Sequence, residues 1–134
     1  MGQNIVIMAT NSLKIQRFRA NDLVDNGGKQ FELGRSWCDD FFEFNRDDTE
    51  VVINLTFKSL CNEYEKYTNK NIELKLSGVS TRGDRKAYVN GENGRSQIKD
   101  FFIKDLQLTV ENNSEDYFGV YKSSFGEDYL YYLR

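Results

Sequence analysis

Residues 49–79 read TEVVINLTFKSLCNEYEKYTNKNIELKLSGV and contain three segments with different periodicities. Residues 50–57 are rich in β-branched and apolar side chains, which predicts a central strand. One face of that strand carries Val51, Ile53, Leu55 and Phe57. In residues 58–68 the apolar spacing changes to three and four, which predicts a short amphipathic helix. Residues 72–76 alternate apolar and polar side chains, which predicts a second, half-buried strand.

The rest of the chain adds strands on both sides of this unit. Residues 3–8 form a short β-rich run, and residues 13–19 fit a strand or a helical turn, of which we favour the strand. Residues 29–37 follow an Asn-Gly-Gly turn signal and alternate as a strand. Residues 78–96 combine four glycines with several cations and predict a long hairpin. Residues 97–111 are predicted to form the last strand.

This order of elements predicts an all-β fold. A five-stranded Greek-key barrel with one short helix between its third and fourth strands is the OB-fold. A small sandwich is the alternative, and the position of the single helix favours the barrel. We assign residues 1–111 to an OB-fold nucleic-acid-binding domain. Residues 112–134 are aromatic and acidic, and we expect them to form a C-terminal extension with a hairpin or a short helix.

The composition of the 134 residues excludes several kinds of chemistry. One domain with a core is expected at this length, and 14% of the residues are aromatic. The absence of histidine removes Ser-His and Cys-His nucleophile pairs and His-ligated zinc. Cys38 and Cys61 form no CxxC motif and are expected to be reduced, apolar residues. We therefore expect no enzymatic activity, no metal and no cofactor.

The sequence also predicts a soluble protein of the cytoplasm with no membrane partner. No apolar run approaches the length of a membrane span, and the N-terminus lacks the basic-then-apolar layout of a signal peptide.

The charges are banded along the chain although the net charge is only -3. Residues 39–50 hold six acids and one arginine, whereas residues 58–104 hold ten lysines and arginines against six acids. Residues 1–35 are mildly basic and residues 105–134 acidic. Basic stretches interleaved with aromatic residues are what a nucleic-acid groove requires. Surface charges that alternate by chance are an equally weighted alternative.

Residues 49–79 resemble the centre of single-stranded DNA-binding proteins of the bacterial and phage type. That family has an apolar strand ending in Phe, a Lys-x-Leu helix start, a helical Tyr, a lysine-rich turn and a strand ending in Gly. Here these positions are filled by Phe57, Lys58, Leu60, Tyr67, Lys70 and Gly78. Ser36-Trp37 and Thr81-Arg82 are similar to the end of the family's second strand and the start of its long hairpin. The resemblance spans about residues 3–110.

The resemblance implies a specific function. It implies an OB-fold protein that binds single-stranded DNA without strong sequence preference and protects it during replication or recombination, in a phage or mobile element and hence in the host cytoplasm. It also implies self-association as a homo-oligomer. The sequence does not separate DNA from RNA, because contacts to the 2′-hydroxyl are not visible in it.

Binding of this kind needs aromatic faces for bases and cations for phosphates. The stacking candidates are Trp37, Tyr88 and Phe57. Trp37 fits a stacking role and a core role equally, Tyr88 favours stacking, and Phe57 favours the core unless a bulge turns it outward. The candidate cations are Arg17, Arg19, Lys75, Arg82, Arg85 and Lys86.

The acidic segment 39–50 supports a different function. Its carboxylates match no ligand spacing for a metal-dependent nuclease, so a solvated loop is the better interpretation. Together with Phe41, Phe42 and Phe44, which we expect to anchor the loop, these acids also fit a small immunity-type inhibitor. Such a protein would bind a basic surface on a protein partner and no nucleic acid.

Overall fold

The computed structural model describes residues 12–24, 31–33, 36–42, 50–77, 87–90 and 97–134. These residues form mostly β-sheet with a few short helices, so the predicted all-β class is confirmed. The predicted strand at residues 3–8 lies outside the described residues, as do residues 78–86 and 91–96 of the predicted hairpin.

The strands are β1 (Leu13–Arg17), β2 (Glu32–Leu33), β3 (Glu50–Phe57), β4 (Asn71–Ser77), β5 (Ala87–Asn90), β6 (Tyr117–Lys122) and β7 (Asp128–Leu133). They form one sheet in the order β1-β6-β7-β3-β4-β5-β2. Five longer strands, β1, β6, β7, β3 and β4, continue into the short strands β5 and β2. All neighbours are antiparallel except β3 and β7, which run parallel.

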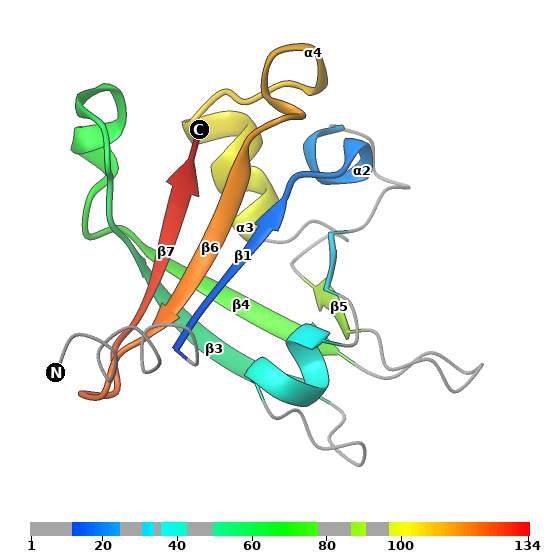
Figure 1. Ribbon diagram of the computed structural model, residues 1–134, viewed down its shortest axis with the longest axis vertical. Coiled ribbons are helices and arrows are strands. Elements are labelled where there is room, and N and C mark those ends of the chain that lie inside the picture. The colour runs from blue at the N-terminus through cyan, green and yellow to red at the C-terminus, as the bar shows by residue number, and fades with distance from the viewer. Residues whose placement is uncertain (1–11, 25–30, 34–35, 43–49, 78–86, 91–96) are drawn as a thin grey trace, which may run out of the picture.

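The sheet curls around the core but does not close. Figure 1 shows β1, β6 and β7 crossing in front of β3 and β4. β1 and β2 stand at opposite ends of the strand order and do not pair with each other in the described part of the chain. The predicted five-stranded closed barrel is therefore not confirmed, because the described strands number seven and the sheet they form is open.

The helix expected between the third and fourth strands is present between β3 and β4 as a 3₁₀ helix, η2 (Asn62–Tyr67). Asn69 follows it in the left-handed region at φ 77°, a conformation that Asn tolerates better than most residues. From there the Asn69 amide donates a 2.8 Å hydrogen bond to the carbonyl of Phe57. This bond returns the chain to β3, so that β4 can start beside it.

The predicted strand at residues 97–111 is wrong. Two short helices, α3 (Gln97–Asp100) and η4 (Phe101–Asp105), occupy its first half, and α4 (Val110–Asn113) follows. The buried apolar residues of these two helices recur at helical spacing and are Ile98, Phe101 and Phe102. Alternation holds only for Leu106 and Leu108, in the link before α4, where Leu106 has helical dihedral angles and Gln107 lies in the left-handed region at φ 57°. In the described segments, none of the helices combines the length and apolarity needed to cross a membrane.

Two further boundaries differ from prediction. Residues 112–134 do not form an extension, because β6 and β7 lie in the middle of the sheet between β1 and β3. The proposed division at residue 111 therefore cuts through the sheet. Of residues 29–37 the structure describes 31–33 and 36–37; in these, β2 covers two residues, and the π-helical turn η1 (Ser36–Phe41) begins where the strand was expected to end.

The core fills the space between the curled sheet and the α3–η4 segment, and it is largely aromatic. Its largest fully buried side chains are Trp37, Phe31, Phe57, Phe101, Phe102 and Phe118. Phe18 at the end of β1 meets Phe102 edge-to-face with 4.9 Å between ring centroids. Since aromatic pairs prefer such offset contacts, they join α3–η4 firmly to the inner face of the sheet.

A short helix, α2 (Ala20–Leu23), follows β1 and covers one end of this core. The amide of Arg19 donates a 2.9 Å hydrogen bond to Oδ2 of Asp22, as in a capping box. Leu23 is buried in the core, and so is the Asp22 side chain.

Candidate nucleic-acid interface

Trp37, the first stacking candidate, lies in the core with 1% of its surface exposed. Its ring stacks on Phe118 at 5.7 Å between centroids, and the ring of Phe41 meets it edge-to-face. The indole nitrogen donates a 2.6 Å hydrogen bond to Oε1 of Gln16. The assignment of Trp37 to base stacking is therefore corrected, because an enclosed ring offers no face to a base. The alternative core role is the one observed.

Phe57 is enclosed in the same way, with 1% of its surface exposed. Its ring meets Phe101 edge-to-face at 4.7 Å between centroids. The core role favoured by its alternation with Leu55 is confirmed, and no bulge turns Phe57 outward. The prediction that Phe57 binds nucleic acid is therefore also corrected, because its enclosed ring cannot stack on a base.

The hairpin candidates are only partly described. Tyr88 lies in β5, where its Cα is paired with Ser77 of β4 and Glu32 of β2, and only the backbone of this strand is described. Arg82, Arg85 and Lys86 lie outside the described residues. Their proposed role in phosphate binding stays a prediction.

The three candidate cations that the structure describes, Arg17, Arg19 and Lys75, are each paired with a nearby acid. Nε of Arg19 lies 3.7 Å from Oδ2 of the buried Asp22. Nζ of Lys75 lies 3.3 Å from Oε1 of Glu73 on the same strand, β4, which Figure 1 shows behind β6 and β7. Lys75 on β4 is separated from Arg17 on β1 by three strands of the sheet.

The structure brings together a group of side chains that sequence reasoning missed. We call it the tyrosine face, and its members are Tyr117 and Tyr121 of β6 and Tyr129 and Tyr131 of β7. Side chains of a strand alternate between its two faces, and Phe118, Val120, Leu130 and Tyr132 of these strands point into the core. The four tyrosines therefore share the opposite, outer face, which is turned toward the reader in Figure 1.

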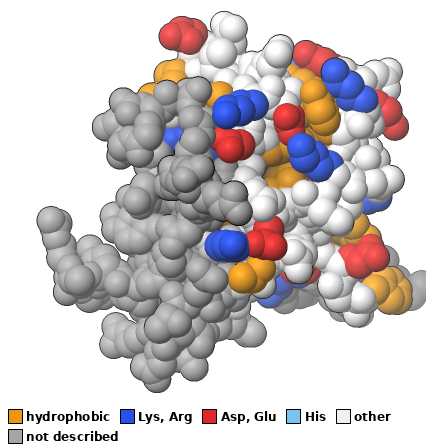
Figure 2. Space-filling view, turned by 180° about the vertical axis from the view of Figure 1, so that it is seen from behind, with side chains coloured by type: hydrophobic (Ala, Val, Ile, Leu, Met, Phe, Trp, Pro, Cys, Tyr) orange, Lys and Arg blue, Asp and Glu red, His pale blue; other side chains and the backbone are white. Residues whose placement is uncertain are grey.

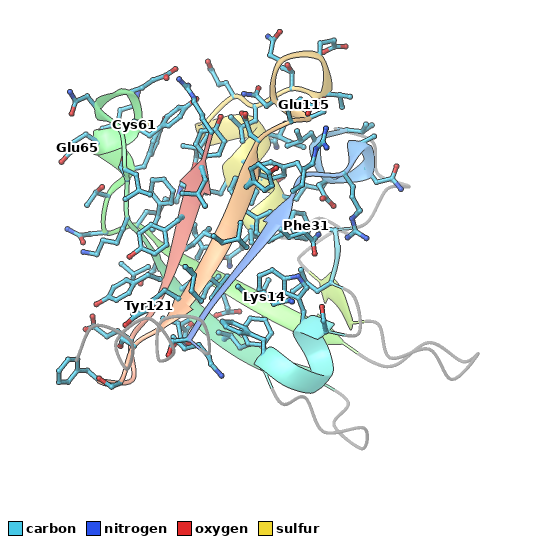
Figure 3. The ribbon with its side chains drawn as sticks, in the orientation of Figure 1. Lys14, Phe31, Cys61, Glu65, Glu115 and Tyr121 are labelled. Atoms are coloured by element: carbon cyan, nitrogen blue, oxygen red, sulfur yellow. The ribbon has the colours of Figure 1, made fainter. Side chains whose placement is uncertain are left out.

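Tyr121 and Tyr129 form the centre of the tyrosine face. They are directly opposite each other in the β6–β7 ladder, and their rings are stacked at 16° with centroids 6.4 Å apart. Figure 3 labels Tyr121 close to the end of β6, where the turn to β7 begins. Tyr117 lies at the other end of β6 and is 40% exposed. The face thus offers aromatic rings along most of β6.

Gly119 allows β1 to pack closely beside these tyrosines. A Cβ at this position would lie 3.3 Å from Cγ1 of Ile15 and 3.4 Å from the carbonyl oxygen of Lys14. Ile15 therefore lies across Gly119 and remains 48% exposed. It adds apolar surface between Tyr117 and Tyr121.

One cation stands at each side of the tyrosine face. Arg17 of β1 is paired with Tyr117 in the ladder and forms an exposed ion pair with Glu115. Lys58 follows β3, and its ammonium lies 5.6 Å from the ring centroid of Tyr129. Exposed ion pairs are weak, so Arg17 can exchange Glu115 for a phosphate at little cost.

The hydroxyl groups of Tyr129 and Tyr131 stay protonated at neutral pH, because the pKa of each is raised. Tyr129 donates a 2.6 Å hydrogen bond to Oε2 of Glu127, and this bond raises the pKa of Tyr129. Burial, with a smaller contribution from Tyr121, raises the pKa of Tyr131. These phenols therefore add no negative charge that would repel a phosphate backbone.

The acidic segment 39–50 is described only at its ends. Phe41 is buried against Trp37 and Phe42 is half-buried, which agrees with their expected role as anchors of this loop. Phe44 and the acids between residues 43 and 48 lie outside the described residues.

The tyrosine face left a signal in the sequence. Tyrosines recur at even spacing in two short segments, 117–121 and 129–131, which is typical of one face of a hairpin.

A comparison of the chain with models of known protein families finds no match, and neither does a comparison with curated proteins.

Proposed function

We propose that this protein binds single-stranded nucleic acid, without strong sequence preference, on the tyrosine face. The observation that carries the proposal is the stacked pair Tyr121 and Tyr129 on the outer face of the sheet. Every base has a π-face, so aromatic side chains on a sheet bind bases whatever their identity. The protein acts in this proposal as a binding protein, with no catalytic step.

The cations beside the tyrosines support the same proposal. Arg17 and Lys58 stand on opposite sides of the face, so a strand whose bases lie on the tyrosines would carry its phosphates past both. Two acids, Glu127 and Glu115, lie close to these two cations, so the net charge of the tyrosine face is low. We therefore expect stacking to contribute more than phosphate contacts. Protection of exposed strands during phage or mobile-element replication or recombination is the role that we propose for this binding.

The proposal is tested by fluorescence anisotropy of a labelled oligo-dT at low salt. We expect saturable binding by the natural protein and weaker binding by Tyr121→Ala and Tyr129→Ala. Stacking contributes about 1–3 kcal/mol per base, so each loss should lie between about 5-fold and 150-fold in affinity. Tyr121→Phe, which keeps the ring, is the matched control and should bind nearly as well as the natural protein.

Two outcomes would reject the tyrosine face as the site. Absence of binding at low salt would reject nucleic-acid binding altogether and favour the protein-binding alternative at residues 39–50. Binding that Tyr121→Ala and Tyr129→Ala leave unchanged would place the strand elsewhere on the protein. A parallel titration with oligo-U measures whether the 2′-hydroxyl matters.

A further inference from the structure

The turn between β6 and β7 presents an aromatic side chain to solvent. Phe125 is 93% exposed, the most exposed of the large hydrophobic residues that the structure describes. Its position is fixed by the turn. The hydroxyl of Ser123 accepts hydrogen bonds from the amides of Phe125 and Glu127 at 3.3 and 3.1 Å, and Gly126 adopts φ +86°. A benzyl group is thus held away from the body of the protein.

A pocket of about 270 Å³ lies on a different part of the molecule. It is formed where α3 and η4 cover the edge of β4, and it is lined by Lys70, Asn71, Ile72, Gln97, Asp100, Phe101, Lys104 and Asp105. Ile72 and Phe101 are buried and supply its apolar floor. Figure 2 shows the side away from the tyrosine face, with an apolar hollow edged by basic and acidic side chains. Closed apolar cavities of about 150 Å³ accept benzene, so this pocket, although most of its lining is polar, is large enough for a benzyl group.

The charges at the rim of the pocket leave one cation available. Lys70 forms an ion pair with Asp105, and its ammonium lies 5.7 Å from the ring centroid of Phe101. Lys104 is exposed and forms no ion pair with the residues that the structure describes. On the turn, Glu127 is exposed and accepts its hydrogen bond from an uncharged phenol. An exposed ammonium beside the pocket thus matches an exposed carboxylate beside Phe125.

We propose that Phe125 of one copy of this chain inserts into the pocket of a second copy, with Glu127 beside Lys104. Phe125 cannot fill the pocket of its own chain, since it is almost fully exposed there. The two surfaces differ, so the contact is heterologous and each copy keeps one free turn and one free pocket. Such contacts produce closed rings or open chains of copies. This assembly does not depend on nucleic acid.

The contact is small and should be weak. Stable protein complexes bury at least about 1,200 Å², far more than one aromatic side chain and its neighbours supply. Sedimentation velocity over a rising series of concentrations, without nucleic acid, should therefore show the natural protein shifting from monomers to a series of larger species. A protein that stays monomeric up to millimolar concentration would overturn the proposal.

Two variants identify the surfaces. Phe125→Ser removes the inserted side chain and leaves the pocket intact, whereas Lys104→Glu places an acid opposite Glu127 and leaves Phe125 intact. Each alone should sediment as a monomer. An equal mixture should form dimers and nothing larger, because Phe125 of the Lys104→Glu chain still fits the pocket of the Phe125→Ser chain.

The matched controls are Leu60→Ser and Lys66→Glu. Leu60 is 62% exposed and Lys66 is an exposed lysine, and both lie outside the turn and the pocket. Both controls should associate as the natural protein does. Association of Phe125→Ser at the natural strength, or a mixture that stays monomeric while the natural protein associates, would show that the surfaces are wrongly chosen. Circular dichroism confirms that each variant is folded.

Discussion

The indole nitrogen of Trp37 donates a 2.6 Å hydrogen bond to Oε1 of Gln16, and this contact joins η1 to the inner face of β1. The residues are 21 positions apart in the chain. The sequence fitted Trp37 equally to base stacking and to the core, and this bond holds its only polar atom inside the core. In our proposal, bases bind instead on the outer side of the sheet, at the tyrosine face.

The role of Trp37 predicts the effect of its replacement. Trp37→Phe should lower the free energy of unfolding by about 1–3 kcal/mol. The substitution removes the indole N–H and leaves the buried Oε1 of Gln16 without its hydrogen-bond donor. Urea unfolding followed by circular dichroism measures the change. In the double variant Gln16→Leu, Trp37→Phe the orphaned acceptor is removed, so part of the lost stability should return. A double variant less stable than Trp37→Phe would contradict this account.

Trp37 also predicts a spectroscopic result. Because the indole is enclosed, its fluorescence emission should lie at the short wavelengths of a buried tryptophan. It should change little when oligo-dT is added. Strong quenching on binding would show that the ring meets the bases and would restore the stacking role.

Two neighbouring residues of β7 predict opposite effects. Tyr131 lies on the tyrosine face, whereas Tyr132 points into the core, where its hydroxyl donates to Asp116 and accepts a 3.2 Å bond from Nδ2 of Asn113. Tyr131→Ala should weaken oligo-dT binding, whereas Tyr132→Phe should leave binding unchanged. Tyr132→Phe should instead lower the free energy of unfolding by about 1.5–3 kcal/mol, since it removes a bond to a charged group.

The pH dependence of Tyr132 gives a second readout. Burial, followed by the bond to Asp116, raises the pKa of Tyr132 from 10.0 to about 12. The folded state therefore keeps a proton that the unfolded chain loses. Stability from this group is complete below pH 10 and should fall as the pH rises toward 12. Tyr132→Phe should reduce this loss, and an equal loss in the variant would rule out Tyr132 as its source.

The salt dependence of binding tests the cations of the tyrosine face. Each phosphate contact to a single strand contributes about 0.7 to the slope of log affinity against log salt. Arg17→Gln and Lys58→Gln should each make the slope shallower by about that amount. Lys75→Gln is the matched control, because Lys75 lies on β4 beside Glu73 and away from the tyrosines. A slope that changes only in the control would move the phosphate path to β4.

Asp22 predicts a second pH dependence, in the acidic range. Only 1% of it is exposed, and burial raises its pKa above 3.8 although Arg19 and Lys99 act against the shift. The folded state therefore binds a proton more tightly than the unfolded state. The contribution of Asp22 to stability should fall as the pH rises from 3.8 through the raised pKa.

The variant Asp22→Asn isolates this contribution. It keeps an oxygen that can accept the hydrogen bond from the amide of Arg19 and has no charge to bury. Its unfolding free energy, measured by urea titration at several acidic and neutral pH values, should vary less with pH. A pH profile identical to that of the natural protein would show that Asp22 does not titrate in this way.

Local patterns predicted the elements around residues 50–77. Strand β3, helix η2 and strand β4 follow each other as expected, because their periodicities are carried by adjacent residues. The pattern failed at residues 97–111, where alternation at Leu106 and Leu108 concealed a helical spacing at Ile98, Phe101 and Phe102. Both periods fit a short apolar segment, and packing against the sheet selected the helix.

The candidate site could be predicted only in part. The last residues were recognised as rich in tyrosine, yet they were placed in an extension rather than in the sheet. Tyr121 is paired with Leu13, and Leu55 with Asp128 in a parallel register. Such pairs join residues far apart in the chain, and no local period encodes which distant strand becomes a neighbour.

By itself, the sequence determined that this protein is built mainly of strands and rich in aromatic side chains, and that histidine chemistry is absent. Only the tertiary structure decided which aromatic rings face solvent. Trp37 and Phe57 lie in the core, whereas Tyr121 and Tyr129 lie on the outer face. Strands β6 and β7 lie between β1 and β3, and this position fixes which side of each strand meets the core. Burial follows from contacts among all strands at once, and it is therefore a property of the assembled sheet.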